Sequence, residues 1–151
     1  MSTQTPYHLH QSLGYHLSIA ARIQERRLDE QLKTLGLTRT SWCILLAVGN
    51  ENLSQPSDIA DFVGIDRTAT SRALRQMEDA GLLARSLGTA DKRTRRVVLT
   101  DKGETAIAKA TPMARDNAEQ MSALLASGDE KRLIELLTKL HENRETPLKT
   151  L

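Results

Sequence analysis

Apolar residues recur at intervals of three and four over the first third of the chain, which is the spacing of one helix face. This spacing predicts a long helix over residues 9–35 that Gly36 ends. A second, mostly buried helix is predicted after Thr38, a residue type that favours helix N-termini. Its apolar side carries Trp42, Leu45, Leu46 and Gly49, and the first helix carries Leu9, Leu13, Leu17, Ala20, Leu28, Leu32 and Leu35.

Two shorter helices are predicted next, each bounded by residues that begin or end helices. Pro56 suits the first turn of one helix, and Gly64 ends it. Asp66 caps the following helix, which stops at Gly81. We expect this helix to pack through one face and to leave the opposite face open. The packing face contains Ala69, Ala73, Met77 and Ala80, and the open face contains Thr68, Ser71, Arg72 and Arg75.

Beyond Gly81 the pattern changes to two short apolar runs separated by charged residues. Gly88 suits a turn between the runs, so a β-hairpin is predicted. Two further helices are predicted over residues 101–125 and 129–143. The expected fold class is mainly α with a small β-hairpin. A short helix, a glycine turn, a second helix and a hairpin follow one another as in a winged helix-turn-helix.

Length and composition fit one ordinary globular domain. The chain has 151 residues, of which 39% are hydrophobic and 26% are charged, enough for a core without disulfides. The single cysteine, Cys43, has no second cysteine to pair with. The N-terminal residues lack a signal-peptide pattern, and no apolar run approaches the roughly 18 residues of a membrane helix. We therefore expect a cytoplasmic protein that does not enter a membrane.

Positive charge is concentrated in the middle of the chain. The net charge is only +2, but residues 66–96 contain eight Lys or Arg and four Asp or Glu. Such a segment is expected where a polyanion docks. Arginine can pair with guanine in the DNA major groove, and threonine methyls can contact thymine. The open face with Arg72 and Arg75 therefore favours DNA binding, although an ordinary solvated helix face can have the same composition.

Two stretches resemble the MarR family of bacterial transcription regulators. They are SDIADFVGIDRTATSRALRQMEDAGLLAR and DKRTRRVVLTDKG, and the resemblance extends over nearly the whole chain. Asp91 and Arg93 match the D-x-R of the family's wing, and Arg85 matches the arginine that ends the preceding strand. The family's L-T-x-x-G sequel is matched by Leu99, Thr100 and Gly103.

This resemblance implies one domain over residues 1–151. It implies a winged-helix DNA-binding lobe at 37–100 and dimerisation helices at 7–36 and 101–151. It also implies a homodimer that binds a pseudo-palindromic operator on double-stranded DNA and is released by a small ligand. We expect the regulator to be a repressor.

The wing residues receive different expected roles within this resemblance. Arg93 is expected to enter the minor groove, whose narrow A·T-rich segments attract arginine. Asp91 is expected to pair internally and to orient Arg93 or Arg85. Three further cations of the hairpin either contact DNA phosphates or only solvate the hairpin, and both roles remain open. They are Lys92, Arg95 and Arg96.

The resemblance also places a ligand pocket between the dimerisation helices and the DNA-binding lobe. The first, second and fifth helices would form it here. A small aromatic carboxylate would suit side chains that combine an aromatic body with a cation. The candidates are Tyr15, His16, Arg22 and Trp42, of which Trp42 also suits the core.

Other functions compete with this one. A winged-helix module can use the same surface to bind protein or RNA, but a protein-binding module needs no cationic helix face beside a cationic wing. A redox-responsive regulator would use Cys43, which lies between apolar residues. No nucleophile motif or phosphate loop is present, so we expect neither an enzyme nor a cofactor. A metal-responsive regulator would use the histidines near the N-terminus, but the sequence around them lacks the further ligands that a metal site needs. These histidines are His8, His10 and His16.

The ends of the chain carry apolar stripes that one small winged domain cannot cover. A second copy related by a twofold axis would cover them. It would place two recognition helices against half-sites about 34–36 Å apart, so the stripes independently favour a homodimer. They contain Leu13 and Leu17 near the start and Leu133, Leu136, Leu137 and Leu140 near the end.

Overall fold

The structure, a computed structural model, describes residues 5–87 and 95–142. These residues form six α-helices and one antiparallel hairpin, which confirms the predicted fold class. A short 3-10 turn precedes the first helix, which begins later than predicted because the Ser12 hydroxyl caps it by accepting from Tyr15 N. The elements are α1 (Leu13–Lys33), α2 (Arg39–Gly49), α3 (Pro56–Val63), α4 (Arg67–Asp79), β1 (Leu83–Leu87), β2 (Arg95–Leu99), α5 (Asp101–Ser122) and α6 (Asp129–His141).

Local capping chemistry explains the boundaries of the central helices. The Thr38 hydroxyl accepts a hydrogen bond from Ser41 N, and Ser41 Oγ accepts one from Thr38 N, so the two residues form a capping box on α2. Gly64 ends α3 with a φ of 80°, a conformation that glycine adopts without strain. The Asp66 carboxylate lies 2.7 Å from Ala69 N and caps α4. The predicted caps are confirmed.

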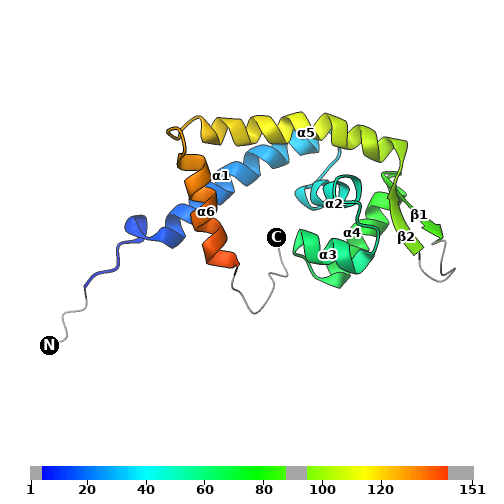
Figure 1. The fold of residues 1–151 in the computed structure, drawn as a ribbon, viewed down its shortest axis with the longest axis horizontal. Coiled ribbons are helices and arrows are strands. Elements are labelled where there is room, and N and C mark those ends of the chain that lie inside the picture. Colours follow the sequence, from blue (N-terminus) through cyan, green and yellow to red (C-terminus); the bar gives the residue numbers. More distant parts are fainter. Residues whose placement is uncertain (1–4, 88–94, 143–151) are drawn as a thin grey trace.

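Two long helices, α1 and α5, lie side by side along the molecule (Figure 1). The helix-turn-helix and the hairpin lie at one end of this pair, and α6 lies at the other. Helix α2 joins the two parts, because it packs on α1 and α5 as well as on α3, α4 and β2. The most deeply buried large apolar side chains come from α1, α2, α3, α4 and β2. They are Leu32, Ile44, Leu45, Ile59, Leu74 and Val97.

The base of the hairpin is held on two sides. Strand β1 pairs with β2 from Leu83 opposite Leu99 to Leu87 opposite Arg95. On the other edge of β2, Val97 N donates a hydrogen bond of 2.9 Å to Ser54 O in the segment before α3. The hairpin is therefore anchored to the lobe by backbone bonds as well as by its buried side chains.

The hairpin leads into α5 through a tight joint at Thr100 and Gly103. Thr100 Oγ1 accepts a hydrogen bond of 3.1 Å from Gly103 N and donates one of 2.6 Å to Gly81 O. Thr100 N donates to Leu82 O at 3.2 Å. Gly103 packs so closely on this backbone that a Cβ would overlap the Leu82 carbonyl oxygen. The L-T-x-x-G stretch thus fastens the start of α5 to the lobe.

The terminal helices expose apolar side chains. No residue of α6 is buried, and α6 does not pack closely on any other described element. The partly buried members of the predicted stripes are Leu17 and Leu137. No helix in the described part of the chain is long and apolar enough to cross a membrane. The exposed large apolar residues of these helices include Leu13, Leu133, Ile134, Leu136 and Leu140.

Candidate nucleic-acid interface

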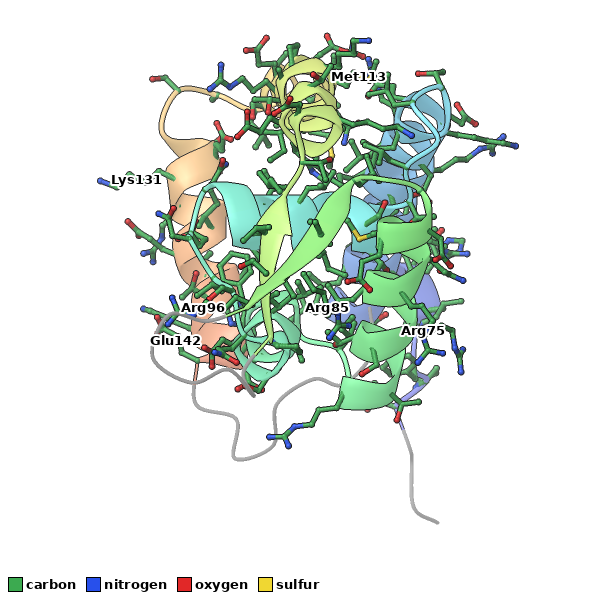
Figure 2. The ribbon with its side chains drawn as sticks, turned by 90° about the vertical axis from the view of Figure 1, so that its right-hand side faces the viewer. Arg75, Arg85, Arg96, Met113, Lys131 and Glu142 are labelled. Carbon is green, nitrogen blue, oxygen red and sulfur yellow. The ribbon has the colours of Figure 1, made fainter. Side chains whose placement is uncertain are left out.

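Helix α4 presents a cationic face to solvent. Figure 2 shows Arg75 on the outer side of this helix. All four residues predicted on the open face are exposed, so the orientation of this face is confirmed. Their role in DNA binding stays a prediction. Together with Arg67 they line a shallow hollow, which is formed by Arg67, Thr68, Ser71, Arg72 and Arg75.

The packing face of α4 differs in part from the prediction. Its buried residues are Thr70, Leu74 and Met77, whereas Ala80 is exposed, so the prediction that Ala80 packs is wrong. Leu74 buries more apolar area than an alanine can and centres the packing face on itself. Thr70 tolerates burial because its hydroxyl donates a hydrogen bond of 2.8 Å to Asp66 O. Half-buried at the edge of the face are Ala69 and Ala73.

The arginines of α4 lack the carboxylate partners that most other described arginines have. Arg67, Arg72 and Arg75 form no ion pair with any described residue. Their charge is therefore available to an external anion such as a DNA phosphate. By contrast, an acidic oxygen lies within 3.2 Å of Arg26, Arg27, Arg39, Arg85 and Arg132.

An ion pair ties the first strand of the hairpin to α4. Arg85 Nε donates to Glu78 Oε1 at 2.7 Å. Sequence reasoning missed Glu78, because this pairing depends on the chain reversing direction at Gly81. Figure 2 shows Arg85 on the side of the hairpin that faces α4 and Arg96, which is exposed, on the other side. Outside the described residues lie the predicted wing residues Asp91, Lys92 and Arg93 and the side chain of Arg95.

The structure divides the predicted ligand-binding residues among three places. Trp42 is buried in the core on α2. Tyr15 and His16 lie near the start of α1 with ring centroids 5.5 Å apart, and Tyr15 also lies against His10. Arg22 is exposed further along α1. These four side chains do not lie together within a single chain, and their joint role in ligand binding stays a prediction.

The alternative sensing chemistries gain no support from the geometry. Burial raises the pKa of the Cys43 thiol, and the charge of Arg39 offsets this only in part. A thiol with a raised pKa is poorly ionised at neutral pH and is a poor redox sensor. His16 Nε2 lies 2.9 Å from His10 O. In the described ranges, no group of three or more His, Cys, Asp or Glu side chains could hold a metal ion.

A short helix, a glycine turn, an exposed cationic helix and an anchored hairpin define a winged helix-turn-helix protein with long flanking helices. A model of the MarR family matches residues 35–94.

Three solved structures have similar folds. BpsR from Bordetella bronchiseptica, whose DNA binding is regulated by 6-hydroxynicotinic acid, has a TM-score of 0.83 and 21% identity, covering 93% of this chain and 100% of BpsR. Sco3205 from Streptomyces coelicolor, in complex with DNA, has a TM-score of 0.79 and 23% identity, covering 97% and 94%. CouR from Rhodococcus jostii RHA1, bound to p-coumaroyl-CoA, has a TM-score of 0.81 and 16% identity, covering 93% and 99%.

The family model and the fold agree over the same elements. Residues 35–94 match the MarR family model, and the chain as a whole has the fold of the MarR family regulator Sco3205. Members of this family regulate transcription and are not enzymes.

Proposed function

We propose that this protein is a homodimeric repressor that binds a pseudo-palindromic operator in the cytoplasm and is released by a small ligand. The observation that carries the proposal is the cationic face of α4, where Arg67, Arg72 and Arg75 lack acidic partners among the described residues. Phosphates and guanine edges are suitable partners for such arginines. The DNA complex of Sco3205, which has a similar fold, supports this choice of partner.

The construction of α4 supports direct reading of DNA bases. Thr68 and Ser71 are short, so the helix can approach base edges closely while Arg72 and Arg75 reach further. The opposite side of the helix is fixed in the core, where Leu74 is 1% exposed. The cationic face is therefore presented by a rigid element, which lowers the entropic cost of binding.

The exposed apolar residues of the terminal helices support a homodimer. Leu13 is 63% exposed and Leu133 is 45% exposed, although both belong to helices with an apolar side. A second copy would bury these side chains, and twofold symmetry would pair them with equivalent residues. The two α4 helices would then meet half-sites about 34–36 Å apart on one side of the duplex.

A small aromatic carboxylate is the proposed ligand. BpsR responds to 6-hydroxynicotinic acid, and CouR binds p-coumaroyl-CoA; both ligands contain an aromatic ring. Tyr15, His16, Arg22 and Trp42 remain the proposed contacts in the dimer. A panel of aromatic acids tests this by thermal shift, since a ligand at 100 times its Kd stabilises the protein by about 2.7 kcal/mol.

The central experiment measures DNA binding as a function of salt. Duplexes selected from a random library provide the operator, and fluorescence anisotropy gives Kd at each salt concentration. A protein that makes 6–10 phosphate contacts loses about 10³–10⁵ in affinity between 50 and 200 mM salt, and we expect a comparable slope. Arg72→Ala/Arg75→Ala should weaken binding by at least about tenfold.

Arg115→Ala is the matched control, because Arg115 is an exposed arginine on α5, away from α4. It should bind the operator like the wild-type protein. Failure to select any preferred duplex, or equal affinity for the double variant and the control, would refute the proposed function. Tight binding to protein or RNA with no duplex binding would instead identify the competing winged-helix role.

A further inference from the structure

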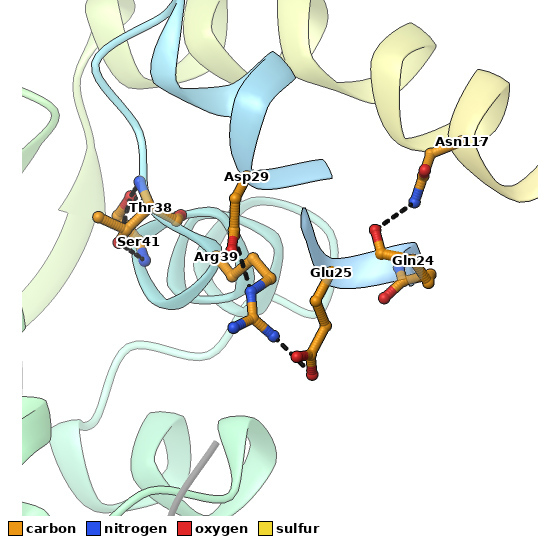
Figure 3. A network of polar contacts seen from close by, with 7 residues as sticks. All are labelled: Gln24, Glu25, Asp29, Thr38, Arg39, Ser41 and Asn117. Carbon is orange, nitrogen blue, oxygen red and sulfur yellow. Dashed lines mark hydrogen bonds and ion pairs between the residues drawn. The ribbon is translucent and has the colours of Figure 1, made fainter. Parts of the chain in front are cut away.

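One guanidinium connects α1 to α2 at the junction between the long helices and the lobe. Arg39, the first residue of α2, has Nη1 2.7 Å from Glu25 Oε1 and Nε 2.8 Å from Asp29 Oδ1. Figure 3 shows Arg39 reaching from α2 to both acids, which lie one turn apart on α1. The arginine side chain is 31% exposed, less than either acid. Two separate contacts to one rigid planar group fix direction as well as distance.

Helix α2 does not need Arg39 for its own stability. The capping box of Thr38 and Ser41 already satisfies its N-terminus. A cation in the first turn also opposes the helix dipole, whose positive end lies there. Burial lowers the pKa of Arg39, but the hydrogen bonds and charges of Asp29 and Glu25 more than compensate and raise it overall. The arginine therefore serves the contact with α1.

The acids that receive Arg39 lie on a stretch of α1 that α5 holds from another side. Asn117 of α5, which is 1% exposed, donates its Nδ2 to Gln24 O at 3.2 Å. Figure 3 shows this bond next to Glu25. Arg27 donates to Asp116 of α5 at 3.1 Å. Helix α1 is thus fixed on α5 where it presents Glu25 and the neighbouring acid to the lobe.

The covalent connection alone does not set the angle between α1 and α2. It consists of residues 34–38, and Gly36 in its middle has a φ of +70° with nothing within 4 Å of where a Cβ would lie. The turn itself is held by a hydrogen bond of 3.0 Å from Leu37 N to Leu32 O and by the buried Leu37 side chain. The bridge formed by Arg39 adds a polar contact between the two helices that restricts a change in their angle.

We propose that Arg39 sets the angle between α1 and the winged lobe and thereby the half-site spacing that the protein accepts on DNA. This inference rests on the proposed function. A lobe of this size has a radius of gyration of about 11 Å. A rotation of about 10° about the junction moves a point about 20 Å away by about 3.5 Å, which is close to the rise of one base pair. Each added base pair also rotates one half-site by about 34–36° around the duplex, so loss of the bridge should weaken the discrimination against spacings one base pair away without abolishing it.

The test compares operators whose half-sites are one base pair closer, unchanged or one base pair further apart. Wild-type protein should prefer one spacing. The preference ratio is the affinity for the preferred spacing divided by the affinity for a spacing one base pair away. It should fall by at least about threefold in Arg39→Ala and in Glu25→Gln/Asp29→Asn, because angular freedom lets the lobes follow the altered sites. Arg39→Lys should give an intermediate ratio, since a lysine supplies the charge without the planar fork. Arg26→Ala, which breaks an exposed pair on the same helix, should keep the wild-type ratio.

A second readout does not depend on DNA. Spin labels at Ser18 on α1 and Asp61 on α3, in a Cys43→Ser background diluted with unlabelled chain, report the distance between α1 and the lobe within one chain. Arg39→Ala should broaden this distance distribution. An unchanged distribution, or affinity that falls by the same factor at every spacing, would overturn the inference. If wild type prefers no duplex, the proposed function fails, but the label distances still decide whether Arg39 fixes the angle.

Discussion

Replacing Gly103 with alanine tests the joint between the hairpin and α5. The new Cβ would overlap the Leu82 carbonyl oxygen and would lie 3.1 Å from Leu99 Cδ2. The carbonyl is part of the backbone and accepts the hydrogen bond of 3.2 Å from Thr100 N. It cannot rotate away as a side chain can, so relief requires the start of α5 to move off the lobe.

The expected cost follows from two opposing effects. Forcing a methyl into a closely packed region costs about 1–3 kcal/mol, and a backbone neighbour places Gly103 at the upper end of this range. Alanine gains about 1 kcal/mol over glycine in helix propensity. We therefore expect a net loss of about 2 kcal/mol, which lowers Tm by about 4–8 °C in a chain of this size.

Thermal unfolding followed by circular dichroism measures this loss at one fixed protein concentration, because association changes the apparent Tm. Gly14→Ala is the matched control. Gly14 lies in the first turn of α1, where a Cβ would have nothing within 4 Å. This variant should be stabilised by up to about 1 kcal/mol. If Gly103→Ala melts together with wild type, or if both variants melt at the same temperature, the close approach at Leu82 is refuted.

Four further outcomes are expected. Arg72→Ala and Arg75→Ala should each change DNA binding in one of two ways. If the lost arginine reads a base, the protein should lose its preference at one operator position; if it contacts a phosphate, binding to all sequences should weaken evenly. Binding-site selection in which neither variant shows either effect would contradict this. Arg93→Ala should cost about 1–3 kcal/mol of operator binding and lower the salt slope by about one, whereas unchanged salt titrations would exclude the wing role. A chain ending at Gly128 should sediment as a monomer at micromolar concentration, and a persistent dimer would show that α6 is not its interface. Burial raises the pKa of Cys43, so its alkylation should need a higher pH than that of a free thiol and should accelerate in urea; a rate equal to that of a free thiol at pH 7 would count against burial.

The helices of the lobe could be predicted because their ends depend on neighbouring residues in the sequence. Thr38 and Asp66 bond to backbone groups three residues away, and Gly64 needs only its own φ. The open face of α4 could also be predicted, since its polar residues recur with helical period. The buried face could not be assigned fully, because the position of Leu74 in the core depends on packing with elements distant in sequence.

The features that connect elements were beyond sequence reasoning. Arg85 and Glu78 meet only because the chain reverses at Gly81, and Arg39 meets two acids on another helix. Any of the many charged residues could form such pairs, so the sequence offers no basis for selecting them. The L-T-x-x-G stretch could be recognised as a family match. Its role as a joint emerges only from the hydrogen bonds of Thr100 in the folded chain.

The ion pair between Glu78 and Arg85 affects how strongly the hairpin can contribute to binding. Because β1 is held to α4, docking of α4 in one groove would bring the hairpin to the neighbouring groove at a high effective concentration. The hairpin base would then need little ordering at that moment, so even a weak contact from the wing would add to the affinity of α4. Removing Glu78 would loosen β1 on the α4 side only, because Val97 N still holds β2 to Ser54 O and Leu83 and Val97 stay buried, so we expect the hairpin to lose part of this advantage and not all of it.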